Sequence, residues 1–197
     1  MRLKPSPPPV FSGTQLFDGV DASVADFWRF AMSDLRTNNV RGYLAEFLVA
    51  KAVGSKAARV EWDPWDVTAP DGTRIEVKSS GLLQAWAQAR ISRPSFQVAA
   101  AYGWDATAGT WSADQAFNAD VYVFCLHIAT SHDQYDPLRV EQWRFYVASR
   151  SVVEAQAGAR MGLATLARVC GEPVMFGDLA HSIATAAAGQ DAAERLI

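Results

Sequence analysis

Hydrophobic positions near the N-terminus repeat with helical spacing. Residues 21–36 carry the apolar stripe Val24, Phe27, Trp28, Ala31 and Leu35. This spacing predicts a core-facing helix over residues 21–36, with Asp21 as its N-cap. A second stripe predicts a helix over residues 40–53 that ends at Gly54. It consists of Val40, Tyr43, Leu44, Phe47 and Leu48, and Glu46 lies beside it.

The pattern then changes to the period of β-strands. Residues 73–79 alternate strictly, with Ile75 and Val77 on one face and Glu76 and Lys78 on the other. The nearly continuous apolar run over residues 120–128 predicts a central strand covered on both faces. Further strands are expected at 59–62, 65–68, 95–101 and 142–148, a short helix at 82–89, a turn-rich segment at 106–113, and mostly helices from residue 151.

This order of elements predicts an α/β fold, bordering on α+β, with a mixed central β-sheet flanked by helices. Residues 1–13 contain three consecutive prolines and predict an extended arm. Residues 14–197 are expected to form one domain, with its core at about 40–148 and a helical C-terminal part at 151–197.

Composition narrows the class of protein. The formal net charge of −3 argues against a protein that coats nucleic acid by bulk charge, although a local basic groove stays compatible with it. The two cysteines have no zinc-binding spacing and predict a reducing, cytoplasmic location. No apolar run reaches a membrane-spanning length, so no membrane partner is expected.

Candidate chemistry lies on a predicted β-hairpin. If Pro70, Asp71 and Gly72 form a three-residue loop with Gly72 in the left-handed region, Asp66 lies opposite Glu76. Lys78 shares the face of Glu76 because the strand period is two. A two-residue loop would instead place Asp66 opposite Val77 and on the other face, so this prediction depends on the turn type.

Two opposed carboxylates destabilise a hairpin, but a divalent cation between them removes the repulsion. Mg²⁺ is held by one or two carboxylates together with water and phosphate oxygens. A nearby lysine, here Lys78, can orient a water or stabilise charge on a phosphate. The pattern therefore points to metal-assisted hydrolysis of a phosphodiester.

The combination of a helical Glu46, then Asp66, then Glu76-Val77-Lys78 resembles the PD-(D/E)xK nuclease superfamily, which has the restriction-endonuclease-like fold. The resemblance covers about residues 40–148. It implies that Asp66, Glu76 and the Val77 carbonyl bind the metal and that Glu46 helps to hold the metal or its water. It also implies that Lys78 positions the attacking water or stabilises the transition state. One departure is that Trp65, not proline, precedes Asp66.

The resulting hypothesis is a Mg²⁺- or Mn²⁺-dependent nuclease with Glu46, Asp66, Glu76 and Lys78 as catalytic residues. Its partner is nucleic acid, with DNA favoured over RNA. Residues that could contact the substrate are Ser79, Ser80, Gln84 and Gln97.

Simpler interpretations stay open. Glu76 and Lys78 could be the solvated face of an edge strand, and Glu46 could pair with Arg41 or Lys51 on its own helix. The whole chain could be a catalytically silent nuclease-like module that binds nucleic acid or a protein. It could also be an interaction domain, in which a symmetric homodimer buries Trp104 or Trp111.

Overall fold

The structure is a computed structural model that describes residues 9–105, 108–156 and 158–194. Most of the arm predicted for residues 1–13 lies outside these ranges. The chain divides into two compact units, residues 1–35 and residues 36–197.

The first unit contains one helix, α1 (Val24–Met32). Ser23, not Asp21, is its N-cap: the Ser23 side chain accepts a hydrogen bond from the Asp26 backbone, and the Asp26 carboxylate accepts one from the Ser23 backbone. This reciprocal capping box explains why the helix starts three residues later than predicted. The prediction of a core-facing stripe was wrong, since no residue of α1 is buried. A unit of this size cannot build a sizeable core of its own.

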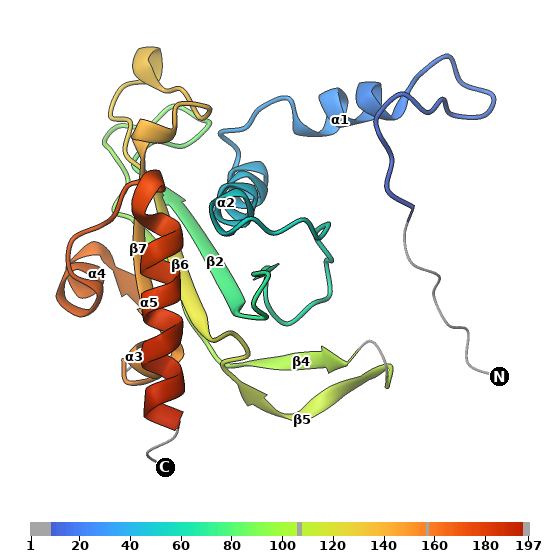
Figure 1. The fold of residues 1–197 in the computed structure, drawn as a ribbon. Coiled ribbons are helices and arrows are strands. Elements are labelled where there is room, and N and C mark those ends of the chain that lie inside the picture. Colours follow the sequence, from blue (N-terminus) through green and yellow to red (C-terminus); the bar gives the residue numbers. More distant parts are fainter. Residues whose placement is uncertain (1–8, 106–107, 157, 195–197) are drawn as a thin grey trace. The chain divides into compact units, whose positions relative to one another are not determined.

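A four-stranded mixed sheet forms the centre of the second unit (Figure 1). Its order is β1 (Val67–Thr68), β2 (Arg74–Gly81), β6 (Val121–His127) and β7 (Trp143–Ser149). Strands β2 and β6 are parallel, whereas the β1–β2 and β6–β7 pairs are antiparallel. The predicted α/β fold with a mixed central sheet flanked by helices is confirmed.

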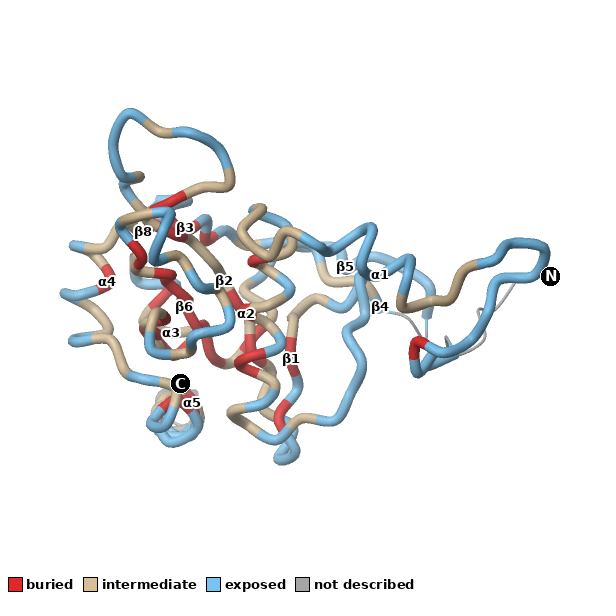
Figure 2. Tube along the Cα trace, turned by 90° about the horizontal axis from the view of Figure 1, so that it is seen from above, coloured by how far each residue is buried: buried red, intermediate tan, exposed pale blue. Residues whose placement is uncertain are grey.

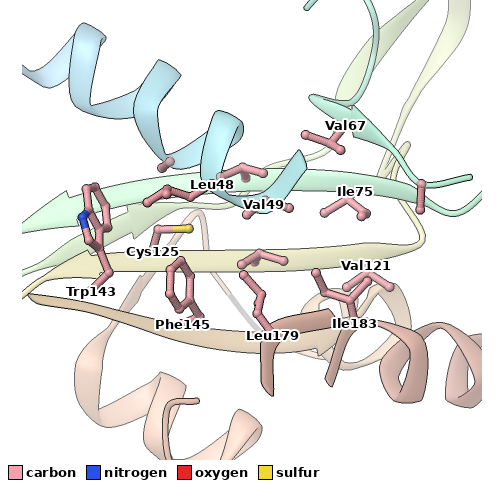
Figure 3. Packing of buried hydrophobic residues seen from close by; sticks show 14 residues of the cluster. Leu48, Val49, Val67, Ile75, Val121, Cys125, Trp143, Phe145, Leu179 and Ile183 are labelled. Atoms are coloured by element: carbon pink, nitrogen blue, oxygen red, sulfur yellow. The ribbon is translucent and has the colours of Figure 1, made fainter. Parts of the chain in front are cut away.

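Two helices cover one face of the sheet. They are α2 (Asn38–Val53) and α5 (Phe176–Glu194). Leu48 and Val49 of α2, and Leu179 and Ile183 of α5, point into a shared apolar core with the sheet (Figure 3). Ile75 and Val77 belong to this core, so the odd-numbered residues of β2 face the two helices.

The opposite face of the sheet is covered by shorter elements. These are α3 (Arg150–Glu154), α4 (Leu163–Cys170) and the two-stranded pair of β3 (Ser95–Gln97) with β8 (Arg160–Gly162). All seven residues of β6 are buried, which confirms the prediction of a strand covered on both faces. Figure 2 shows the buried trace gathered in the sheet and in the segments packed against it.

A second hairpin, β4 (Ala101–Asp105) with β5 (Thr110–Ala116), extends away from the main sheet (Figure 1). It replaces much of the turn-rich segment predicted at 106–113, of which residues 106–107 lie outside the described ranges. Trp104 and Trp111 stack edge to face, 5.2 Å between ring centres. The described elements are completed by two 3₁₀ helices, η1 (His132–Gln134) and η2 (Val140–Gln142).

Two predicted elements are absent from the described chain. Residues 59–62 are irregular and end in a turn instead of forming a strand, and residues 82–89 form bends and irregular segments instead of a helix. In the latter segment the Gln88 side chain accepts a hydrogen bond from the Gln84 backbone, and Ser92 donates from its backbone to Leu82. Such local bonds compete with a helical ladder. Strand β8 was missed because it forms only by pairing with the distant β3.

Helix α2 ends at Gly54 as predicted, but its buried face is rotated from the predicted stripe. The buried residues are Arg41, Ala45, Leu48 and Val49. Tyr43 and Phe47 are exposed instead, because the side of the helix that carries Ala45 packs against the sheet. A Cβ added at Gly42 would lie 3.9 Å from the Ser79 hydroxyl.

The β1–β2 hairpin has the predicted register. Val67 pairs with Ile75 and Thr68 with Arg74, and the Ala69 backbone donates to Thr73. Gly72 has φ +93° and closes the three-residue loop by donating to the Ala69 carbonyl. Continued by one step, this register sets Asp66 opposite Glu76.

Gly72→Ala is expected to lower the free energy of unfolding by about 1–2 kcal/mol, because a Cβ is disfavoured at positive φ. No atom lies within 4 Å of the added Cβ, so the cost comes from the backbone alone. Thermal unfolding measures it. Gly189→Ala in helix α5 is the matched control and should stabilise the protein by about 0.5–1 kcal/mol. If both variants were as stable as the natural protein, the turn assignment would be contradicted.

Candidate active site

Asp66 lies at an edge of β2 that has no strand partner within the described residues. Strand β1 pairs only with Arg74 and Ile75, at the beginning of β2. Beyond that point the Asp66 carboxylate accepts a hydrogen bond from the Val77 backbone, with 2.7 Å between Oδ2 and N. The N–H and C=O of one strand residue point to the same edge. The Val77 carbonyl therefore lies on the edge that Asp66 occupies.

Glu76 and Lys78 project from the other face of β2 than Ile75 and Val77. Their side chains are 19% and 32% exposed, and they form an ion pair with each other. Burial raises the pKa of Glu76, and the charge of Asp66 raises it further, against the opposing effect of Lys78. The predicted convergence of Asp66, Glu76 and Lys78 around one stretch of β2 is thus present in the structure.

Glu46 reaches the same region from helix α2. It lines a cavity of about 160 Å³ together with Asp66. Its Oε2 accepts a hydrogen bond from the Arg59 Nε at 2.5 Å. The helix neighbours Arg41 and Lys51 are therefore not its partners here. Arg59 was missed in the sequence, because its position in an irregular segment 13 residues away gives no periodic signal.

Asp66 connects the three carboxyl groups electrostatically. Burial raises the pKa of Glu46 to about 7, and the charge of Asp66 adds to this effect. Burial likewise raises the pKa of Asp66, although the Val77 N–H and Lys78 lower it. The charge of Asp66 thus opposes ionisation of both Glu46 and Glu76, and a cation beside Asp66 would relieve this repulsion.

The oxygen donors fit a hard divalent cation. Across the described ranges, no three His, Cys, Asp or Glu side chains are grouped closely enough to hold a metal ion by themselves. The candidate set is instead Asp66, Glu76 and the Val77 carbonyl, with Glu46 nearby. One or two carboxylates completed by other oxygens is the set that Mg²⁺ prefers in proteins.

Without metal, the protein should lose stability as pH rises from about 5 to 8, because the folded state holds the Glu46 proton more tightly than the unfolded chain. This contribution is fully present below the ordinary glutamate pKa and is lost as pH passes about 7. In Glu46→Gln, the fall in Tm between about pH 5 and 8 should be smaller than in the natural protein by about 2–4 °C, which corresponds to about 1 kcal/mol of unfolding free energy. Thermal unfolding in chelator measures it.

Glu141→Gln is the control, because Glu141 is an exposed glutamate in η2, away from Glu46 and Arg59. It should keep the pH slope of the natural protein. An unchanged slope in Glu46→Gln would show that Glu46 does not titrate in this range.

A groove of about 580 Å³ begins at Lys78. All four predicted substrate contacts, Ser79, Ser80, Gln84 and Gln97, line it. The Gln84 amide also donates to the Gly81 carbonyl at 3.2 Å and to the Ser92 hydroxyl at 3.1 Å, so it holds the loop after β2 in place. The structure therefore joins these residues to Lys78, while their part in substrate binding stays a prediction.

The groove also contains residues that were not among the predicted substrate contacts. Arg41 comes from α2, Arg160 from β8, and Trp86, 56% exposed, from the loop after β2. Of the described residues that line the groove, none is acidic. The negative net charge of the chain conceals this local basic character. Arg41 lies at the border of the predicted apolar stripe, beside Leu48, and a basic residue at that border is the signal that could have indicated it.

Comparison with protein families gives a match to the model of bacteriophage T4 endonuclease IV over residues 20–162, about three quarters of the chain. The chain belongs to the bacteriophage T4 endonuclease IV family. Comparisons with the curated proteins and with solved structures gave no match.

Membership of the endonuclease IV family supports cleavage of nucleic acid as the activity of this chain. The span shared with the family contains Glu46, Asp66, Glu76 and Lys78, and also the groove that begins at Lys78. Helix α5 lies beyond it. No helix within the described ranges is long and apolar enough to cross a bilayer.

Proposed function

We propose that this protein is a metal-dependent nuclease of the PD-(D/E)xK type that hydrolyses phosphodiester bonds in DNA. The observation that carries the proposal is the meeting of the Asp66 carboxylate with the Val77 backbone at the open edge of β2, beside Glu76 and Lys78. An acid-free groove starts at the same lysine. Nuclease family membership supports the same activity.

Asp66, Glu76 and the Val77 carbonyl would hold Mg²⁺ or Mn²⁺, and Glu46 would orient a water of that ion. A bound divalent cation polarises the phosphate and lowers the pKa of bound water. Burial and the charge of Asp66 raise the pKa of Glu76, and a bound cation would offset both effects.

Lys78 is placed to stabilise charge on the reacting phosphate. Its ammonium group pairs with Glu76, so its position is fixed relative to the carboxylates. It also lines the groove along which the strand would enter. A cation that is already in place costs no reorganisation as charge develops in the transition state. Lys78 therefore serves as the electrostatic partner of the phosphate.

The test is cleavage of linear, nicked and single-stranded DNA, and of RNA, with Mg²⁺ or Mn²⁺ and with chelator. Cleavage of DNA should require the metal and should be lost in Glu76→Gln. Glu141→Gln, in η2, is the control and should cleave normally. Absence of cleavage on every substrate, or cleavage unaffected by chelator, would reject the proposal.

A further inference from the structure

Arg41 is a buried cation on the wall of the groove that begins at Lys78. The residue is only 4% exposed, although it carries a full charge and lies on helix α2. Arginine is rarely buried to this extent unless its charge is paired. Its surroundings therefore require a partner for that charge.

The protein supplies only neutral acceptors to Arg41. Its Nη2 donates to the Asn38 side chain at 2.7 Å and its Nη1 to the Arg36 carbonyl at 3.3 Å. Its Nε is buried and has no acceptor, and no carboxylate pairs with the guanidinium in the part of the chain that the structure describes. A buried charge with an unused N–H is costly. An anion bound from the groove would compensate it.

The Arg41 guanidinium packs closely against the backbone at the end of β2. A Cβ at Gly81 would lie 3.3 Å from the Arg41 Nη1 and 3.1 Å from the Leu83 carbonyl, so the guanidinium lies tightly against the end of β2. Asn38, at the first position of α2, lines the same groove.

The position of Arg41 separates it from the proposed reaction centre. Gly81 follows Lys78 by three residues of strand, or about 10 Å. A nucleic acid strand rises about 3.4 Å per nucleotide. Lys78 and Arg41 are therefore spaced to contact different phosphates of one strand, on a groove whose described lining contains no acid.

We propose that Arg41 and Asn38 form a binding site for a phosphodiester group of the nucleic acid strand, separate from the phosphate that is cleaved. The inference rests on the proposed function for the identity of the strand. The guanidinium group of Arg41 can bind two oxygens of one phosphate in a bidentate manner. This site fixes where the strand lies in the groove.

Asn38→Asp is the sharpest test, because it places a carboxylate on the Arg41 guanidinium without changing the size of the side chain. Asn38 is exposed, and an acidic residue in the first turn of a helix is favourable, so the variant should fold. Asn39→Asp makes the same change one residue further along, at a position that does not line the groove. Arg41→Met removes the positive charge. Arg41→Lys keeps the charge but removes the planar guanidinium group.

The measurement is fluorescence anisotropy of labelled single-stranded and duplex oligonucleotides of about 20 nucleotides, in chelator and over a range of salt. Asn38→Asp and Arg41→Met should weaken binding about 10-fold and reduce the salt slope by about 1. Arg41→Lys should keep the slope but bind more weakly, and Asn39→Asp should bind as the natural protein does. Thermal unfolding establishes that each variant is folded.

The inference is overturned if folded Asn38→Asp binds the oligonucleotides as tightly as Asn39→Asp. It is also overturned if the natural protein binds neither oligonucleotide. Cleavage is measured separately with Mg²⁺. If binding depends on Asn38 and Arg41 but nothing is cleaved, the phosphate site stands and the nuclease proposal fails. If the natural protein cleaves while Asn38→Asp binds normally, the nuclease proposal stands and the phosphate site fails.

Discussion

Lys78→Met is expected to lower the rate of metal-dependent cleavage by about 10²–10⁴-fold, the range found when a preorganised charge or a general acid is removed from an active site. Methionine keeps the length and apolar stem of lysine and removes only the charge. Lys78 is one third exposed, so folding should be retained. The loss should appear in kcat more than in KM, because the charge acts on the developing transition state.

Lys51→Met is the matched control for this experiment. Lys51 is an exposed lysine on α2 whose ammonium lies 5.2 Å from the centre of the Phe47 ring, and it does not line the groove. It should cleave within about twofold of the natural protein, as expected for a surface change away from the site. A Lys78→Met enzyme that cleaves as fast as this control would remove Lys78 from the mechanism.

Mg²⁺ or Mn²⁺ should raise the Tm of the natural protein, and Asp66→Asn is expected to abolish this rise and to reduce cleavage by about 10²-fold or more. The amide oxygen can still accept the Val77 hydrogen bond, so the hairpin should keep its geometry. In chelator at pH 8 the variant should be at least as stable as the natural protein. The reason is that the charge of Asp66 raises the pKa of both Glu46 and Glu76.

Asp71→Asn makes the same chemical change in the turn of the same hairpin. The Asp71 carboxylate accepts a hydrogen bond from the Thr73 backbone at 2.9 Å, and the residue is exposed. This control should keep both cleavage and the metal-dependent rise in Tm. If Asp66→Asn still shows the full rise, the metal is bound elsewhere or not at all.

Local patterns in the sequence predicted the parts of the site that belong to one hairpin. The loop at Pro70, Asp71 and Gly72 sets its own register, because a glycine at positive φ selects the turn. With the register given, strand alternation places Glu76 and Lys78 together. The apolar run of β6 likewise showed that this strand is central, since all its residues require burial.

The failed predictions have different causes. The segment at 82–89 has a composition compatible with a helix, but the side chains of Gln84 and Gln88 bond locally and hold it in bends. Helix α2 was predicted with Tyr43 and Phe47 inward, yet the close approach of Gly42 to β2 turns them outward. Local side-chain hydrogen bonds outweighed the helical preference in the first case, and a tertiary contact outweighed the predicted orientation in the second.

Sequence alone determined the hairpin, the central strand and the neighbouring acids and lysine, because each depends on residues close together in the chain. Tertiary structure decided everything that joins distant segments. It paired Glu46 with Arg59, brought Arg160 of β8 to the groove and buried Arg41 beside Gly81. These contacts depend on how α2 and β3 pack around β2, which no local periodicity encodes. The hairpin that carries Asp66 and Glu76 was therefore predictable, and the groove that leads to it was not.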